Sequence, residues 1–366
     1  MPKAALISLF LLVAAILLYL GNLVVYRAIV LTFDITGATH LLLLGVILGF
    51  LSASFIASTI IDSWYYNFFT RSYYQISAVW LGFFAYIFFA SAIYGIAIGI
   101  SHSFAKIGLA LFFVALLLGV YGVFHGRKIV VTKTPISLPN LPRSWRGRRM
   151  VWISDLHLGQ IHGLKFVRDI VARVSALSPD IIFIGGDFYD GTGAPDIPEL
   201  TAPLSQLSAS LGTYFITGNH EEYGDRGRFI SAVASAGIHV LEDEMIDIDG
   251  LQLIGVDYRN ASNTARFKET LSKIPINREN ASILLKHEPK DLGIAHAAGI
   301  SFQISGHTHE AQLWPLGYIT QLIYKGYAYG LKRFKDMQVY ISSGTGTWGP
   351  PMRVGTNGEI VLFTLE

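Results

Sequence analysis

The first 126 residues carry almost no charge, and this feature most restricts what the chain can fold into. The six charged side chains among them are Lys3, Arg27, Asp34, Asp62, Arg71 and Lys106. Each of the four longest charge-free windows holds at least 18 residues, and about 20 residues of helix cross a bilayer. Because a helix satisfies its own backbone in lipid, we expect transmembrane helices over about residues 4–26, 35–61, 77–100 and 105–124.

Two other interpretations of this region are less well supported. The first window resembles a cleaved signal peptide, but its apolar stretch continues to Val25 without a small-residue cleavage site. A soluble helical bundle would need polar outer faces, and the four windows show none. The region over residues 1–126 is therefore predicted to lie in a lipid bilayer.

Basic residues predict the orientation of the spans. Single positive residues occupy the short loops, whereas seven follow the fourth window: Arg127, Lys128, Lys133, Arg143, Arg146, Arg148 and Arg149. Since positive flanks stay in the cytoplasm, we expect the C-terminal part to be cytoplasmic. Pro135, Pro139 and Pro142 disfavour a helix, so residues 127–149 are predicted to form a basic linker, either solvated or lying against anionic headgroups.

From residue 150 onward the pattern changes to short apolar runs that end in polar clusters. Runs at 150–153, 181–184, 214–216 and 283–285 read as buried strands, and helical patterns such as 164–177 lie between them. This alternation predicts an α/β domain over 150–366, with ligands at the carboxyl ends of the strands. The strand-rich last third, including 251–256, 339–342 and 360–365, predicts a second sheet packed face to face on the first.

The polar clusters offer ligands for metal ions. In chain order they contain Asp155 and His157, Asp187 and Asp190, Asn219 and His220, His287, and His307 and His309. Side chains two apart on an extended backbone share a side, which places Asp155 with His157 and His307 with His309. The chain has no cysteine, so any metal uses imidazole, carboxylate or amide ligands, a mixture that suits Mn, Fe or Zn.

Each cluster alone is weak evidence for a metal site, because Asp-x-His or Gly-Asn-His is commonly part of a turn. The full order, with each cluster after an apolar run, resembles the calcineurin-like metallophosphoesterase superfamily over about 150–366. The resemblance implies two packed mixed sheets flanked by helices, and a phosphoester hydrolase with two divalent metal ions. The arrangement as a whole is similar to the bacterial membrane-anchored branch of that superfamily, which implies the inner membrane.

The resemblance also implies individual roles. One metal would be held by Asp155, His157 and His309, and a second by Asn219, His287 and His307, with Asp187 bridging them. His220 would act as a general acid or transition-state donor oriented by Asp190. Glu221 is expected to support His220 or a turn, and His162 to be structural. Where the branch commonly continues its last motif with two glycines, this chain has Glu310 and Ala311.

These expectations together predict a membrane-anchored phosphohydrolase that cleaves phosphodiester or pyrophosphate bonds. An amphipathic nucleotide-linked or lipid substrate is favoured because anchoring keeps the enzyme at the lipid surface. The alternatives are an enzyme with soluble substrates, for which the spans are a tether, and a membrane sensor or transporter without catalysis. Aromatic and basic residues alternate over 314–335, which suits a membrane interface or single-stranded nucleic acid. A formal net charge of +2 argues against a nucleic-acid partner.

Overall fold

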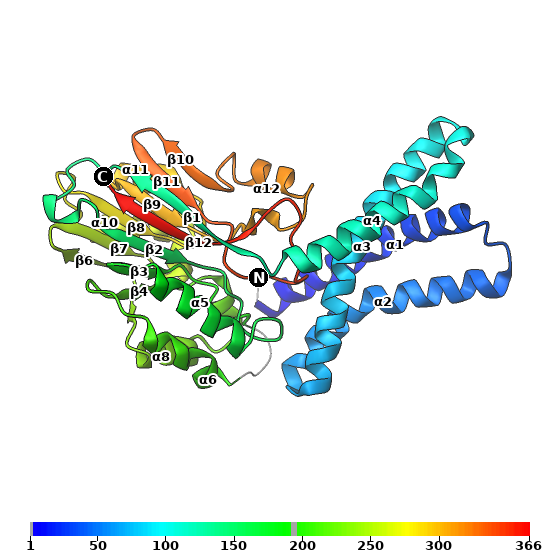
Figure 1. Cartoon of the computed structure of the whole chain (residues 1–366), viewed down its shortest axis with the longest axis horizontal. Helices are drawn as coiled ribbons and strands as arrows, with labels where there is room; N and C mark the ends of the chain where they lie inside the picture. The colour runs from blue at the N-terminus through cyan, green and yellow to red at the C-terminus, as the bar shows by residue number, and fades with distance from the viewer. Residues whose placement is uncertain (1–2, 192–195) are drawn as a thin grey trace. The chain divides into compact units, whose positions relative to one another are not determined.

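The computed structural model describes residues 3–191 and 196–366 (Figure 1). Contacts between residues divide the chain into two compact units. The first runs to His125 and takes in Gly349–Met352, and the second contains Gly126–Trp348 and Arg353–Glu366.

The first unit is built from four long apolar helices, as predicted. They are α1 (Lys3–Phe33), α2 (Ala38–Trp64), α3 (Phe68–Ile100) and α4 (Gly108–His125). A 3-10 segment, His102–Ile107, precedes α4. Within the described residues, each of the four helical regions is long and apolar enough to cross a membrane.

Two of these helices extend beyond the charge-free windows. α1 continues past Arg27 to Phe33, and α3 begins at Phe68, ahead of the expected residue 77. The start of α3 is set by Asn67, whose side chain accepts hydrogen bonds from the backbone N–H groups of Phe69 and Thr70. The Thr70 hydroxyl accepts a hydrogen bond from the Asn67 backbone N–H, which completes a capping box. Hydropathy marks the part of a helix that suits lipid, whereas capping marks where the helix begins.

The second unit contains two six-stranded mixed sheets. The first sheet has, in spatial order, β1 (Ile129–Ile136), β12 (Gly358–Leu365), β2 (Arg149–Ile153), β3 (Ile181–Ile184), β4 (Thr213–Phe215) and β5 (His239–Val240). The second has β10 (Gly330–Phe334), β11 (Met337–Ile341), β9 (Phe302–Ser305), β8 (Ser282–Leu285), β7 (Leu251–Gly255) and β6 (Glu244–Ile248). β2, β3 and β4 run parallel, as do β7, β8 and β9.

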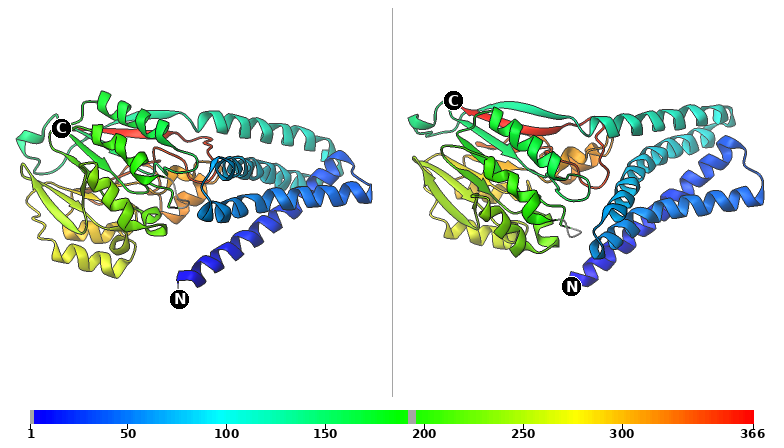
Figure 2. Two further views of the ribbon diagram at one scale, coloured as in Figure 1. Left: turned by 90° about the horizontal axis from the view of Figure 1, so that it is seen from below. Right: turned by 60° about the horizontal axis from the view of Figure 1, so that its bottom comes forward.

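The main core lies between the two sheets. Trp152 and Phe183 from the first sheet pack in one buried cluster with Ile283 and Phe302 from the second. Helices cover the outer faces (Figure 1 and Figure 2). On the first sheet they are α5 (Leu164–Ala176), α6 (Ile197–Thr201) and α8 (Arg226–Ser235); on the second they are α10 (Thr264–Lys273) and α11 (Leu292–Ala298). The predicted pair of packed mixed sheets flanked by helices is confirmed.

The structure differs from the sequence-based expectation at the linker and at the last strand. Residues 127–149 are not all linker, because Ile129–Ile136 forms β1, an edge strand paired in parallel with β12. Pro135 lies in this strand, and an edge strand tolerates its missing N–H. β12 belongs to the first sheet, where it pairs with β1 and β2, and not to the second sheet as the strand-rich last third suggested.

Candidate metal centre

The predicted ligands come together at the carboxyl ends of strands from both sheets. Asp155 and His157 follow β2, Asp187 follows β3, Asn219 opens the short helix α7 (Asn219–Tyr223) after β4, His287 follows β8, and His307 and His309 follow β9. Among the described residues, three groups place their ligand atoms within 4.8 Å of one another. They are Asp155, His157 and His309; His157, Asp187 and His220; and Asp187, His287 and His307.

In the first ligand group, two imidazole nitrogens lie close together. His157 Nε2 lies 3.0 Å from His309 Nε2, and His309 Nε2 lies 3.6 Å from Asp155 Oδ1. Two nitrogens that are each about 2.1 Å from one ion and at right angles to each other lie about 3 Å apart. Asp155 Oδ2 is buried and has no hydrogen-bond partner among the described residues. An unpaired buried carboxylate oxygen is costly in a protein interior, so this group fits a metal ion.

The second ligand group also combines closely spaced ligand atoms with a buried oxygen that lacks a hydrogen-bond partner. His287 Nε2 lies 3.2 Å from His307 Nδ1 and 3.1 Å from Asp187 Oδ2. The side-chain oxygen of Asn219 is buried without a hydrogen-bond partner within the described ranges, while its amide nitrogen donates to the Tyr223 hydroxyl. That bond fixes the amide so that Oδ1 is the atom left available. The amide oxygen and two imidazoles suit a divalent cation.

Asp187 lies where a bridging ligand would. Its Oδ2 atom is 3.1 Å from His287 Nε2 and 3.9 Å from His157 Nε2, so one oxygen faces both groups. Its other oxygen accepts a hydrogen bond from the backbone N–H of His220 at 2.8 Å. This bond holds the carboxylate in place between the two sets of ligands.

Glycines allow the two carboxylates to approach the backbone. A Cβ atom at Gly218 would collide with the carboxylate of Asp187, and one at Gly306 would collide with that of Asp155. With no side chain at Gly306, Asp155 Oδ1 accepts a hydrogen bond of 2.9 Å from the backbone N–H of His307. The glycines before Asn219 and His307 therefore make room for ligands.

The ligand-bearing turns have an unusual backbone. Asp155, His157, Asp187, His307 and His309 all have positive φ, between 48° and 71°. The prediction that paired ligands share a side of an extended strand is wrong, because the strands end before them. Left-handed conformations cost L-residues about 1–2 kcal/mol each, and such strain gathers at functional sites.

Burial and charge set the protonation of the imidazoles. Burial lowers the pKa of His307 to about 4, and burial also holds the pKa of His309 well below its usual value. Both rings are therefore neutral at pH 7, which is the form that binds metal. Burial lowers the pKa of His287 as well, but the carboxylate of Asp187 outweighs it and raises that pKa to about 10. Burial raises the pKa of Asp187, yet His287 and His220 hold it well below its usual range.

His220 lies beside both ligand groups, and its ring contacts the backbone carbonyl of Asp190. His220 Nδ1 lies 2.7 Å from the Asp190 carbonyl oxygen but 3.8 Å from its carboxylate. Because a carbonyl only accepts, Nδ1 carries the proton and Nε2 remains available. Burial lowers the pKa of His220, while Asp187 and Asp190 raise it, and the net effect is a lowered pKa. The Asp190 carboxylate lies nearer to His157 Nδ1, at 3.6 Å.

Glu221 and His162 have structural contacts. The buried Glu221 carboxylate accepts backbone N–H bonds from Asp187 at 2.9 Å and Gly218 at 2.7 Å, so it ties two ligand turns together. Burial raises the pKa of Glu221 to about 7. His162 Nε2 accepts a hydrogen bond from the Thr347 backbone N–H at 3.0 Å, and its ring stacks on Phe166.

Sequence reasoning missed Arg353 and Trp348. Arg353 is fully buried, and its guanidinium donates to the carbonyl oxygens of Ser343 and Gly346 at 2.7 Å and of His309 at 3.3 Å. It thereby braces the turn that carries His309. Trp348 is half exposed, and its ring centroid lies 5.9 Å from that of His220. No local pattern marks either residue, because both act through contacts between distant segments.

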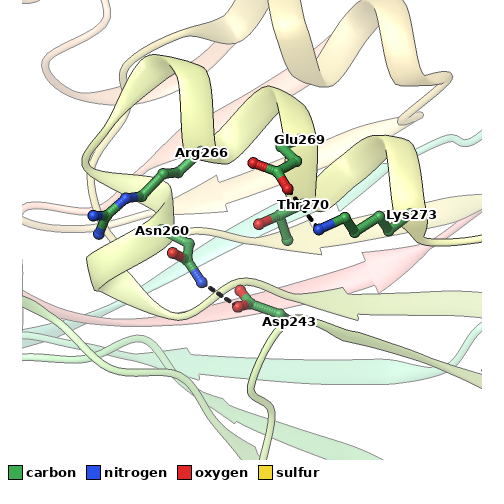
Figure 3. A pocket seen from close by; sticks show the side chains of 6 residues that line it. All are labelled: Asp243, Asn260, Arg266, Glu269, Thr270 and Lys273. Atoms are coloured by element: carbon green, nitrogen blue, oxygen red, sulfur yellow. Dashed lines mark hydrogen bonds and ion pairs between the residues drawn. The ribbon is translucent and has the colours of Figure 1, made fainter.

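A separate hollow of about 310 Å³ lies along α10 and contains none of the predicted ligands. Its lining residues are Asp243, Asn260, Arg266, Glu269, Thr270 and Lys273 (Figure 3). Asn260 donates to Asp243, and Lys273 pairs with Glu269, so most of its polar groups satisfy one another. The ligand groups at the strand ends therefore remain the candidate site.

Comparisons with known proteins agree with this geometry. The family model for the calcineurin-like phosphoesterase matches residues 148–311. The chain is 30% identical over 270 residues to an uncharacterized metallophosphoesterase of Helicobacter pylori, covering 72% of this chain and 70% of that protein. It is 32% identical over 286 residues to a transmembrane protein with metallophosphoesterase domain of Danio rerio, covering 73% and 64%. An uncharacterized metallophosphoesterase of Aquifex aeolicus is 30% identical over 260 residues, covering 69% and 98%.

The four apolar helices make the protein an integral membrane protein, as the name of the Danio rerio relative says of that protein. The family model spans every ligand-bearing turn from Asp155 to His309, and the buried His and Asp groups fit the metal site that this family uses. The chain therefore belongs to the calcineurin-like phosphoesterases, a family of metal-dependent phosphoesterases.

Proposed function

We propose that this protein is a membrane-anchored phosphohydrolase that uses two divalent cations, of Mn, Fe or Zn. The observation that carries the proposal is the pair of ligand groups that share Asp187, with one carboxylate oxygen 3.1 Å from His287 and 3.9 Å from His157. One cation would be held by Asp155, His157 and His309, and the other by Asn219, His287 and His307. Bound there, the cations would polarise the phosphoryl group and activate the attacking water.

The remaining residues position groups and move a proton. The Asp190 carbonyl fixes the His220 ring through Nδ1, so that Nε2 can donate a proton to the leaving oxygen when the ring is protonated. Glu221 and Arg353 hold the ligand turns in place through backbone groups. Asp190 acts in this proposal mainly through its carbonyl on His220 and its carboxylate near His157.

The proposed substrate has a phosphodiester or pyrophosphate bond in an amphipathic, nucleotide-linked or lipid molecule. Support comes from the four spans, which keep the catalytic domain at a lipid surface. Soluble phosphoesters remain the second candidate, with the spans as a tether. A transporter or sensor without catalysis is less well supported, because buried His and Asp side chains gather in groups that could hold metal ions.

We further propose that the catalytic domain faces the cytoplasm of a bacterium with the spans in its inner membrane. The seven basic residues between Arg127 and Arg149 follow the fourth span directly, and such residues resist translocation. A lipid bilayer and a phosphoester substrate are then the partners that the site needs.

Hydrolysis of bis(p-nitrophenyl) phosphate by the purified full chain with Mn²⁺ tests the proposal. His220→Ala should lower kcat by about 10²–10⁴-fold, the usual contribution of a general acid or base, while bound Mn stays as in the wild type. Glu279→Ala, at an exposed site, serves as the matched control and should leave both unchanged. Loss of metal together with activity in His220→Ala would show that His220 is a ligand and not a proton donor.

A further inference from the structure

The short helix α12 (Gly317–Ile323) has no buried residue, although most of its side chains are apolar. The exposed fractions of Tyr318, Ile319, Leu322 and Ile323 are 69%, 55%, 80% and 60%, and Trp314 just before the helix is 54% exposed. Contiguous apolar surface of this kind marks an interaction site in a soluble domain. The three buried clusters described for the second unit contain no residue of α12.

Basic side chains accompany this apolar surface. Lys325 lies two residues after α12, and Lys332 lies near the start of β10, the end of that strand nearest the candidate ligands; both are exposed. An amphipathic surface with aromatic and aliphatic residues accompanied by Lys suits the boundary between acyl chains and anionic headgroups. The charge of this surface therefore favours a lipid leaflet over a second copy of the same surface.

The membrane spans of the same chain hold the catalytic domain near such a leaflet. α4 ends at His125 and β1 begins at Ile129, so three residues connect an apolar span to the catalytic domain. A connection of three residues reaches at most about 11 Å. This connection keeps the start of β1 close to the end of the span, and β1 begins at the end of its sheet where β2 stops and the candidate ligands follow.

The segment that contains α12 is anchored at both of its ends. The backbone N–H of Trp314 donates to the Val354 carbonyl at 2.9 Å. The Thr308 hydroxyl donates to the Ala328 carbonyl at 2.7 Å. Thr308 lies between two predicted ligands, so the second of these bonds joins the end of the α12 segment to a ligand-bearing turn.

Tyr324 connects α12 to the ligands themselves. It follows the last residue of α12, and its hydroxyl donates to the Glu288 carboxylate at 3.2 Å. Its ring centroid lies 6.2 Å from that of His307. The apolar surface and the metal ligands therefore belong to one continuous structure.

We infer that α12, with Trp314, inserts into the headgroup boundary of the leaflet and presents the metal centre to phosphoesters that are embedded there. The bound partner is a lipid surface with anionic headgroups. The insertion itself is independent of catalysis, whereas the choice of an embedded substrate rests on the proposed function.

The absence of cysteine from the sequence makes the insertion directly measurable. The full chain carrying Leu322→Cys is spin-labelled and placed in nanodiscs of phosphatidylcholine and phosphatidylglycerol. Collisions of the label with oxygen, which concentrates in lipid, and with a water-soluble nickel complex report its depth. Lys268→Cys on the exposed side of α10 is the control. We expect the label at Leu322→Cys to collide more often with oxygen than with the nickel complex, and the label at Lys268→Cys to show the reverse.

Two outcomes would overturn the inference. A Leu322 label as accessible to nickel as the Lys268 label would show that α12 lies in water. A Leu322 label shielded from both oxygen and nickel would show that protein covers the helix instead of lipid.

A matched pair of diesters separates this inference from the proposed function. Hexadecyl p-nitrophenyl phosphate enters the leaflet, whereas methyl p-nitrophenyl phosphate stays in water, and both release the same phenol. Leu322→Asp should lower the rate on the hexadecyl ester about tenfold and leave the methyl ester unchanged, and Ala265→Asp on α10 should change neither. Equal losses on both esters would contradict presentation of the leaflet substrate, while no hydrolysis of either ester by the wild type would contradict the proposed function and leave the depth measurement standing.

Discussion

At the scale of single residues, the centre combines strained backbone with unpaired ligand atoms. Four consecutive residues, from His309 to Gln312, have φ between 49° and 61°. Only His309 among them is a predicted metal ligand, so the strain of the other three serves the turn that carries it. Glu310 and Ala311 stand where the resemblance leads one to expect glycine, and glycine adopts this conformation without a Cβ penalty.

Replacing Ala311, whose φ is 61°, by glycine should therefore stabilise the protein. Relief of the left-handed conformation should raise the free energy of unfolding by about 1–2 kcal/mol. The greater freedom of glycine in the unfolded chain should lower it by about 0.5–1 kcal/mol. The expected net gain appears as a higher Tm in thermal unfolding followed by tryptophan fluorescence in detergent. Ala172→Gly, on the exposed side of α5, is the matched control and should lower stability by about 1 kcal/mol. A decrease in Tm for Ala311→Gly would show that its methyl group packs favourably enough to outweigh the strain.

At the scale of elements, β1 joins the membrane region to the first sheet. It pairs with β12 along all eight of its residues, from Ile129 with Gly358 to Ile136 with Leu365. The Thr132 hydroxyl donates to the buried Glu359 carboxylate at 2.6 Å, and Glu359 also accepts the backbone N–H of Ser343 at 3.0 Å. β1 thus protects the edge of β12 and supports the segment that Arg353 braces.

Truncation tests the structural role of β1. In a mild detergent that covers the apolar surface of α12, a fragment of residues 126–366 keeps the strand and should remain monomeric, whereas a fragment of residues 150–366 should aggregate, because it exposes the backbone of β12 as a free edge. Size-exclusion chromatography and thermal unfolding measure the difference. If both fragments were monomeric with the same Tm, residues 129–136 would be a linker after all.

How much could be predicted from the sequence differs between these elements. The run at 181–184 is fully buried and that at 150–153 is buried throughout, so their apolar composition shows directly that they are strands. β1 is only partly buried and contains Pro135 and Lys133, so its pattern looks like a linker, and its partner β12 lies at the far end of the sequence. The candidate ligands could be selected from the sequence because His and Asp side chains are chemically suited to bind metal, and most of them gather in groups that could hold an ion. Their left-handed backbone and the contacts of Arg353 depend on tertiary structure, which no local pattern records.

At the scale of the whole molecule, an apolar helical region and a charged catalytic region occupy one chain. The sequence has 28 basic and 26 acidic side chains, and only Lys3, Arg27, Asp34, Asp62, Arg71 and Lys106 lie in the first 126 residues. That division explains both the four spans and the polar surface of the second unit. The side of the membrane on which the catalytic domain lies decides which phosphoesters reach it.

The proposed cytoplasmic orientation can be tested by labelling a cysteine at Lys268, which is exposed on α10. In intact bacterial spheroplasts, a membrane-impermeant maleimide should not label Lys268→Cys, because the catalytic domain is on the inner side. After lysis the same cysteine should be labelled fully. The wild type contains no cysteine and gives the background. Full labelling before lysis would show that the catalytic domain lies on the outer side of the membrane.

In the proposed centre, Asp187 joins two groups of ligands into one site for two cations. The most direct test is the number of Mn ions per full chain, measured by mass spectrometry of the metal after equilibration with Mn²⁺ and removal of the excess. We predict two ions per chain in the wild type, and loss of both metal and hydrolysis in Asp187→Ala. Two ions per chain in Asp187→Ala, or none in the wild type, would contradict a two-cation centre bridged by Asp187.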